Sequence, residues 1–141
     1  MAASLQMIED FLARKRVAVV GISRDRQDFS VKLAEELGRR GYDVVPVNAT
    51  ATEMLGQRCY ARVQDIQPPV EAALLMTSPK ATEVVVADCA EAGIGSIWMY
   101  RAVGNGAVSP KAVQFCREHG MKVIPGECPF MFLPDAAGSG S

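Results

Sequence analysis

Short apolar runs alternate with amphipathic segments along most of the chain. The runs lie at 17–20, 44–47, 72–76, 96–99 and 123–124. Continuous apolar runs of about four to eight residues are typical of strands that are buried on both faces of a parallel sheet. The pattern therefore predicts strands at these positions, and it also predicts a weaker strand around Arg58, Cys59 and Tyr60.

Helical spacing of apolar residues predicts a helix in most of the intervals between these strands. An opening helix carries Leu5, Ile8, Phe11 and Leu12, and a second helix over 31–40 is stopped by Gly41. Two later helices begin with the same four residues, Ser-Pro-Lys-Ala, in which serine is a good cap and proline suits the first turn. The buried stripes that we expect on the last three helices consist of Val31, Ala34 and Leu37; of Ala81, Val84, Val85 and Cys89; and of Ala112, Val113 and Cys116.

Strands that alternate with helices of about ten residues favour an α/β fold with right-handed crossovers. At 141 residues the chain has the size of one domain. We therefore expect a single domain with a parallel sheet and helices on both faces. Ligands of such sheets bind beyond the carboxyl ends of the strands. These ends are the segments 21–23, 48, 77–79, 100–101 and 126–128.

The turn after the first strand has the residues of a phosphate site. Gly21 follows the strand, and a helix pattern begins near Ser30. Backbone N–H groups of a glycine turn and a helix start attract phosphate. Hydroxyls of Ser23 and Ser30 and the charges of Arg24, Arg26 and Lys32 add to this attraction. A ligand with several phosphates is the first hypothesis.

Several common functions are disfavoured by what the sequence lacks. Of the dinucleotide glycine pattern only Gly21 is present, and Asn48 stands where an acid would hold the ribose, so NAD is disfavoured. The GxxxxGK[ST] loop of nucleotide hydrolases is missing. Four cysteines without a CxxC pair and a single histidine give no zinc pattern, and free thiols are expected.

The net charge and the hydropathy of the chain disfavour two classes of binding partner, nucleic acids and membranes. The net charge of −1 gives no basic surface for nucleic acid. No apolar run approaches the roughly 20 residues that span a bilayer, and the first ten residues lack a secretory pattern. We expect a cytoplasmic protein that acts on a small-molecule ligand, with neither nucleic acid nor membrane as partner.

The order of the motifs resembles one family. VAVVGIS, FSVKLAEEL, RRGYDVVPVN, LGQRCYARVQDI, TSP, EAGIGSIWM and GMKVIPGECPFMF follow one another over roughly residues 10 to 133. This series is similar to the coenzyme A-binding proteins that are related to the CoA-binding half of the succinyl-CoA synthetase α subunit. The resemblance implies a Rossmann-like domain over 1–135, with a flexible tail over 136–141, and CoA or an acyl-CoA lying across the strand ends.

Positions carried over from the family give a candidate site. The resemblance places Gly21, Ser23, Arg24 and Arg26 at the diphosphate, Asn48 near the adenosine, Thr77, Ser78 and Pro79 along the ligand's edge, and Cys128 near the thiol. Ser30, Tyr100 and Arg101 join this set because each stands at the start of a helix or the end of a strand. The loop departs from the glycine-rich family pattern, so Asp25 has to point away from the phosphates.

The sequence supports binding better than turnover. The synthetase carries its phosphorylated histidine in a second domain, and His119 stands here in the last turn of a helix, where it suits the terminal carbonyls. We expect non-catalytic binding of CoA or an acyl-CoA. Two alternatives stay open: a subunit of a CoA ligase or oxidoreductase whose catalytic residues come from a partner, and an NAD(P)-binding protein in which Arg24 meets the 2′-phosphate. A homodimer is compatible with either, and residues 130–133 are expected to pack on the domain.

Overall fold

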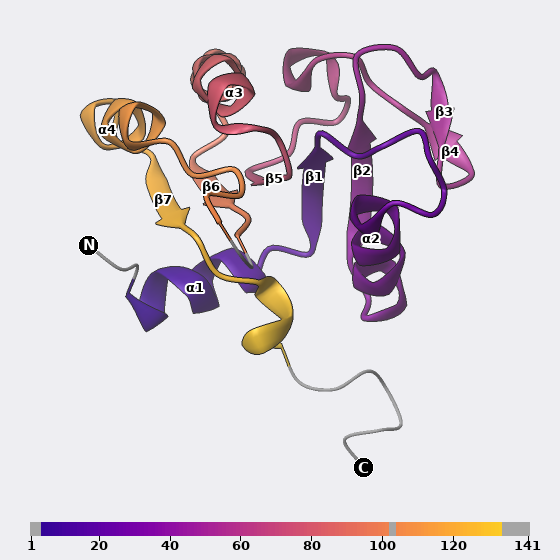
Figure 1. Ribbon diagram of the computed structural model, residues 1–141, viewed down its shortest axis with the longest axis horizontal. Coiled ribbons are helices and arrows are strands. Elements are labelled where there is room, and N and C mark those ends of the chain that lie inside the picture. Colours follow the sequence, from indigo (N-terminus) through magenta and orange to yellow (C-terminus); the bar gives the residue numbers. More distant parts are fainter. Residues whose placement is uncertain (1–3, 102–103, 134–141) are drawn as a thin grey trace.

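The computed structural model describes residues 4–101 and 104–133, which form one α/β unit (Figure 1). Its sheet has five strands in the order β2-β1-β5-β6-β7, and all neighbours are parallel. Their bounds are Arg16–Val20 for β1, Asp43–Val47 for β2, Ala72–Leu75 for β5, Ser96–Met99 for β6 and Lys122–Pro125 for β7. The five apolar runs are thus confirmed as strands. The tail predicted over 136–141 lies outside the described residues.

Helices cover both faces of the sheet, which confirms the predicted Rossmann-like architecture. On one face lie α1 (Leu5–Leu12) and α2 (Phe29–Arg39). On the other lie α3 (Pro79–Ala92), α4 (Pro110–Glu118) and the 3-10 turn η1 (Val63–Asp65), while a second 3-10 turn, η2 (Pro129–Met131), follows β7. The chain leaves β1 toward β2 on one side and returns to β5 on the other side. The switch point of the sheet therefore lies between β1 and β5, where ligand crevices form in this architecture.

Alternation along the strands divides the interior into two cores. Val17 and Val19 face α1 and α2, whereas Ala18 and Val20 face α3 and α4. Trp98 belongs to the first core and is fully buried, with its ring edge-on to Phe11 at 5.3 Å between centroids. Its indole Nε1 donates to the carbonyl of Gly126 at 2.9 Å, which satisfies the polar atom that burial would otherwise penalise.

The predicted stripes of α2 and α4 are confirmed, whereas the predicted stripe of α3 is confirmed at Cys89 and wrong at Val84. Thr82, Val86 and Cys89 are the buried side chains of α3, whereas Val84 is 64% exposed. Three successive valines (84–86) place apolar side chains on more than one side of this helix, so spacing alone does not fix its inward face. Thr82 can be buried because its hydroxyl pairs with that of Thr77 at 2.6 Å.

The segment between β2 and η1 forms a hairpin rather than the simple weak strand that we expected. Strands β3 (Glu53–Met54) and β4 (Gln57–Arg58) pair antiparallel around Leu55 and Gly56. Both turn residues have positive φ, 56° and 70°, as a tight two-residue hairpin requires. Tyr60 then makes one parallel bridge to Val47 and does not extend a strand.

The apolar run after β7 packs on the domain in part. The ring of Phe130 lies under the Arg40 guanidinium at 4.8 Å, and Phe132 is near the Trp98 ring at 6.2 Å. Met131, by contrast, is 72% exposed, so the prediction is wrong for this side chain. Over the described ranges, no helix combines the length and the hydropathy needed to cross a bilayer.

Candidate ligand-binding site

The site begins at Gly21, where β1 ends against the end of β5. Gly21 has φ +88°, and a Cβ built on it would lie 2.9 Å from Cγ2 of Thr77 and 3.0 Å from the backbone of Met76. Both the backbone conformation and the space therefore require glycine here. This close approach brings Thr77 next to the β1–α2 loop, as the strand-end argument predicted.

Ser30 is an internal support of that loop. Its side chain is buried, and its hydroxyl accepts from the Ser23 N–H at 2.8 Å and donates to Asp28 at 2.6 Å. Asp28 also accepts from the Ser30 N–H, which makes it the N-cap of α2. These hydrogen bonds lower the pKa of the Asp28 carboxyl below its usual value. The helix thus begins at Phe29, and a carboxylate already occupies its positive end.

Asp25 is held in a local turn. Its carboxylate accepts from the Gln27 N–H at 3.0 Å, and its own N–H donates to the Ser23 hydroxyl at 3.0 Å. Asp25 is absent from the residues that line the adjacent pocket, as the phosphate hypothesis requires. The turn leaves the two flanking arginines, Arg24 and Arg26, at the pocket.

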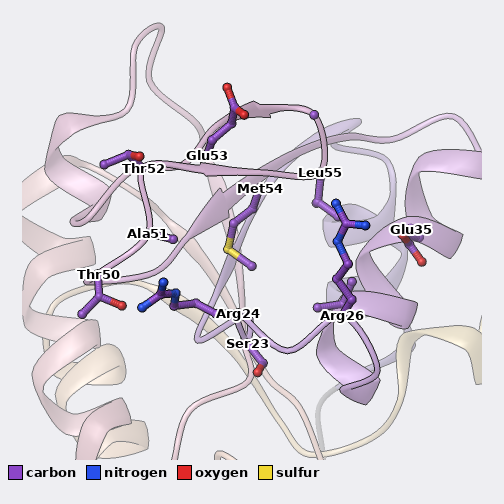
Figure 2. A pocket seen from close by; sticks show the side chains of 12 residues that line it. Ser23, Arg24, Arg26, Glu35, Thr50, Ala51, Thr52, Glu53, Met54 and Leu55 are labelled. Carbon is purple, nitrogen blue, oxygen red and sulfur yellow. The ribbon is translucent and has the colours of Figure 1, made fainter.

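This pocket, which we call the hairpin pocket, lies between the β1–α2 loop and the β3–β4 hairpin and has a volume of about 640 Å³. Figure 2 shows the Arg24 side chain extending toward Thr50 and the Arg26 side chain extending toward Leu55, with Met54 above them. The residues that line it are Ser23, Arg24, Arg26, Val31, Glu35, Thr50, Ala51, Thr52, Glu53, Met54, Leu55 and Gly56.

The two arginines supply unneutralised positive charge. Both side chains are exposed, and neither forms an ion pair or a hydrogen bond with any residue that the structure describes. Glu35 and Glu53 are the carboxylates of the lining, and Glu53 points away from Arg24 and Arg26 in Figure 2. Val31, Met54 and Leu55 add an apolar wall. The pocket thus combines two cationic side chains with an apolar surface.

Asn48 shapes the far wall of the pocket without lining it. Its amide nitrogen donates to the Ile22 carbonyl at 2.8 Å, and its amide oxygen accepts from the N–H groups of Thr50 and Ala51, both at 2.9 Å. One side chain therefore ties the end of β2 to the β1 turn and to the hairpin pocket. The lining residues at 50–56 were missed by sequence reasoning, although Leu55-Gly56 carries a turn signal.

Thr77, Ser78 and Pro79 lie at the adjoining strand end, outside the hairpin pocket. The Ser78 hydroxyl accepts from the Ala81 N–H at 3.2 Å and caps α3, with Pro79 in the first turn. The structure thus confirms the cap that the sequence predicts. Pro79 and Thr77 are half-buried and Ser78 is exposed, so this segment is partly accessible at the carboxyl end of β5.

Tyr100 and Cys128 meet at the ends of β6 and β7. The Tyr100 ring lies 5.7 Å from the ring of Phe29. Burial, together with the nearby Cys128 thiol, raises the pKa of Tyr100 to about 12. Cys128 is half-buried, whereas Cys59, Cys89 and Cys116 are buried, and all four are free.

Arg101 lies at a second pocket, of about 480 Å³, which we call the β7 pocket. It is lined by Ile8, Arg101, Val108, Pro110, Val113, Gln114, Arg117, Ile124, Pro125 and Glu127. The structure therefore divides the predicted residues among the hairpin pocket, its supports, the adjoining strand ends and this separate cavity.

His119 has a local role at the end of α4. Its Nδ1 is 2.9 Å from the Phe115 carbonyl, and its ring stacks on the Phe115 ring at 3.9 Å. Within residues 4–101 and 104–133, no cluster of three or more His, Cys, Asp or Glu side chains is arranged to hold a metal ion.

The parallel sheet, the switch-point glycine and the arginine-bearing pocket define a Rossmann-like ligand-binding domain. Residues 15–134 match the family described as CoA binding domain. An uncharacterized Bacillus subtilis protein, YneT, is 30% identical over 123 residues, which are 86% of this chain and 87% of that protein. The chain therefore belongs to the CoA binding domain family.

Two further relatives extend the comparison. A hypothetical protein from Pyrococcus horikoshii superimposes with a TM-score of 0.82 at 27% identity, over 90% of this chain and 87% of that one. The ADP-forming acetate–CoA ligase II of Archaeoglobus fulgidus is 25% identical over 125 residues, which cover 83% of this chain. The chain spans only 19% of the length of that ligase.

Proposed function

We propose that this protein binds CoA or an acyl-CoA across the carboxyl ends of its strands and has no catalytic machinery of its own. The observation that carries the proposal is the hairpin pocket beyond the carboxyl ends of β1 and β2 in a CoA binding domain, with two arginines that form no ion pair with a described residue. CoA is a polyanion with a flat base at one end and a thiol at the other. Each of these parts has a counterpart along the strand ends.

The phosphate end belongs in the hairpin pocket. Arg24 and Arg26 line the pocket from the β1–α2 loop. The hydrogen bond from the Ser23 N–H to the Ser30 hydroxyl holds the backbone of this loop in place. Charge-assisted hydrogen bonds from guanidinium groups to phosphate are the strong ones in such sites. The base packs against Val31, Met54 and Leu55.

The thiol end lies toward Cys128. From β1 the arm of the ligand passes the ends of β5, β6 and β7, which is three steps of about 4.8 Å each. Along this route it meets the surface of Thr77, Ser78 and Pro79 and then Tyr100, which lies near Cys128. Arg101 lies beyond this path, at the β7 pocket.

Calorimetric titration with CoA tests the proposal. We expect CoA to bind, dephospho-CoA to bind more weakly, and NADP not to compete with CoA. Arg24→Gln should weaken CoA binding by about tenfold, because one charge-assisted contact is lost. Lys122→Gln is the matched control, since it removes one positive charge at the start of β7, at the opposite edge of the sheet. Failure of CoA to bind, or tighter binding of NADP, contradicts the proposal.

A second function is favoured by the size of the ligase relative. The Archaeoglobus ligase is about five times longer than the segment that it shares with this chain. The chain would then act as a CoA-binding subunit whose catalytic residues come from a partner. Co-purification from its own cells at native expression, followed by native mass spectrometry, distinguishes the two: a stable partner with an acid–CoA ligase activity favours the subunit, and a partner-free CoA complex favours the binder.

A further inference from the structure

The β7 pocket is lined by several elements of the fold and lies outside the proposed path of CoA. It lies at the edge of the sheet, where β7 runs between α4 and α1 (Figure 1). Ile8 comes from α1, Val113 and Arg117 come from α4, and Ile124 comes from the strand itself. Elements from both faces of the sheet thus converge on one cavity.

The charge of this pocket is positive. Arg101 and Arg117 line it, and neither guanidinium has an ion pair or hydrogen bond with a described residue. Glu127 is the one carboxylate of the lining, so the three side chains leave a single net positive charge. Such a balance suits a monoanion.

The side chain of Arg101 packs against Gly126, which has no side chain of its own. Its guanidinium lies over Gly126, where an added Cβ would be 2.9 Å from Nη2 and 3.2 Å from Nε. Its own N–H donates to the Glu127 carbonyl at 3.2 Å. Gly126 therefore gives the guanidinium the room it occupies beside the pocket, and any larger residue would displace it.

The floor of the pocket is apolar. Six of the ten lining residues are Ile8, Val108, Pro110, Val113, Ile124 and Pro125. A fully hydrated anion such as inorganic phosphate gains nothing from these surfaces, whereas an anion with a hydrocarbon body covers them. Ligand sites typically combine an apolar lining with a few polar groups, and their volumes begin near 300 Å³, so about 480 Å³ is sufficient for a small molecule.

From these features we infer that the β7 pocket binds a small carboxylate with an apolar body. The carboxylate lies between Arg101 and Arg117, with the Gln114 amide as a further donor, and the hydrocarbon part covers Val113 and Ile124. The inference does not rest on CoA binding, because no lining residue is shared with the hairpin pocket.

The test uses butyrate as the probe and the backbone amide NMR spectrum of the full chain as the readout. We expect saturable shifts at Ile8, Val113, Gln114, Arg117 and Ile124. Butyramide has the same shape without the charge, and inorganic phosphate has charge without the apolar body, so both should bind at least about tenfold more weakly.

Variants decide whether the pocket itself is responsible. Arg117→Gln should weaken butyrate about tenfold, Arg117→Lys should restore part of the affinity, and Lys122→Gln should have no effect. The spectrum of each variant reports its fold in the same experiment. Equal binding of butyramide, shifts confined to the hairpin pocket, absence of saturation, or an unchanged affinity in Arg117→Gln each overturns the inference. CoA titration of Arg117→Gln separates it from the proposed function, since CoA affinity should stay at the wild-type value.

Discussion

The hairpin pocket and the β7 pocket each present two arginines, but they are made from different parts of the fold. The hairpin pocket lies beyond the carboxyl ends of β1 and β2, and its arginines stand on a polar loop among hydroxyl groups. The β7 pocket lies at the sheet edge, and its arginines come from a strand end and a helix over an apolar floor. The two proposals therefore assign the same side chain to different ligands according to its surroundings: several hydrated phosphates in the first case, and one carboxylate with a hydrocarbon body in the second.

Reversing the charge of the hairpin pocket should have the largest effect. The double variant Arg24→Glu and Arg26→Glu is expected to lower CoA affinity about a hundredfold or more, because two charge-assisted contacts become repulsive. Titration calorimetry measures this loss, while butyrate affinity at the β7 pocket should be unaffected.

Lys111→Glu with Lys122→Glu is the control, because it changes the net charge equally at exposed positions that line neither pocket. A similar loss of CoA affinity in this control would mean that overall charge, and not the hairpin pocket, attracts the ligand.

The glycine at the switch point should come next. Gly21→Ala adds a positive-φ penalty and a clash, so we expect the free energy of unfolding to fall by about 3 kcal/mol or more. Gly41→Ala, with φ +97° and open space, should cost only about 1–2 kcal/mol. Gly38→Ala lies within α2 in open space and should raise stability by about 0.5–1 kcal/mol. Urea unfolding measures all three, and equal losses at Gly21 and Gly41 would show that the contact with Thr77 is unimportant.

Asn48 tests whether the hairpin pocket depends on a residue that does not line it. Asn48→Ala removes the bonds to Ile22, Thr50 and Ala51, and we expect a loss of about 2 kcal/mol in stability with weaker CoA binding. Asn48→Asp keeps the acceptor for Thr50 and Ala51 but places a carboxylate oxygen against the Ile22 carbonyl and adds a negative charge near the pocket, so CoA binding should fall here as well. Butyrate binding at the β7 pocket should be insensitive to both variants, and a parallel loss there would indicate general unfolding.

The smallest expected effect concerns the cysteines. We expect one of them to react selectively with CoA disulfide, without a loss of stability. CoA disulfide, incubated with the protein near pH 8, should exchange with Cys128 and release one CoA thiol, forming a mixed disulfide. Cys89 and Cys116 should resist, because burial raises the pKa of their thiols to about 12 and about 11 and keeps them protonated at this pH.

Peptide mass spectrometry locates the adduct. Cys128→Ser should abolish it, while Cys59→Ser should not. An adduct spread over all four cysteines in folded protein would argue against a thiol path that ends at Cys128.

Much of the fold could be predicted because strands buried on both faces are continuous apolar runs. The strands over 17–20 and 72–75 can be recognised from their own residues, without knowing which strands they pair with. The N-cap serines at 78 and 109 predict where two helices begin. The inward face of α3 was not predictable, since three adjacent valines satisfy more than one orientation. The helix α2 begins two residues before the predicted start at 31, because Asp28, and not Ser30, is its N-cap.

The candidate site was predicted less completely than the fold. Strand ends at Ser23 and Asn48 follow directly from topology, whereas the opposite wall at 50–56 depends on a hairpin of two-residue strands. Those strands are too short and too polar to give a periodic signal. The separation of Arg101 from Arg24 likewise depends on where Gly126 leaves room, which only the tertiary structure reveals.

Trp98 gives the protein an optical reporter of its own. It is the chain's single tryptophan, and its indole N–H ends on the carbonyls of Gly126 and Glu127, the residues immediately before Cys128. The emission of this one fluorophore therefore depends on the backbone at the proposed thiol end and at the rim of the β7 pocket. Events at either place can be followed in real time in the unlabelled wild-type protein, without a dye and without altering a single residue.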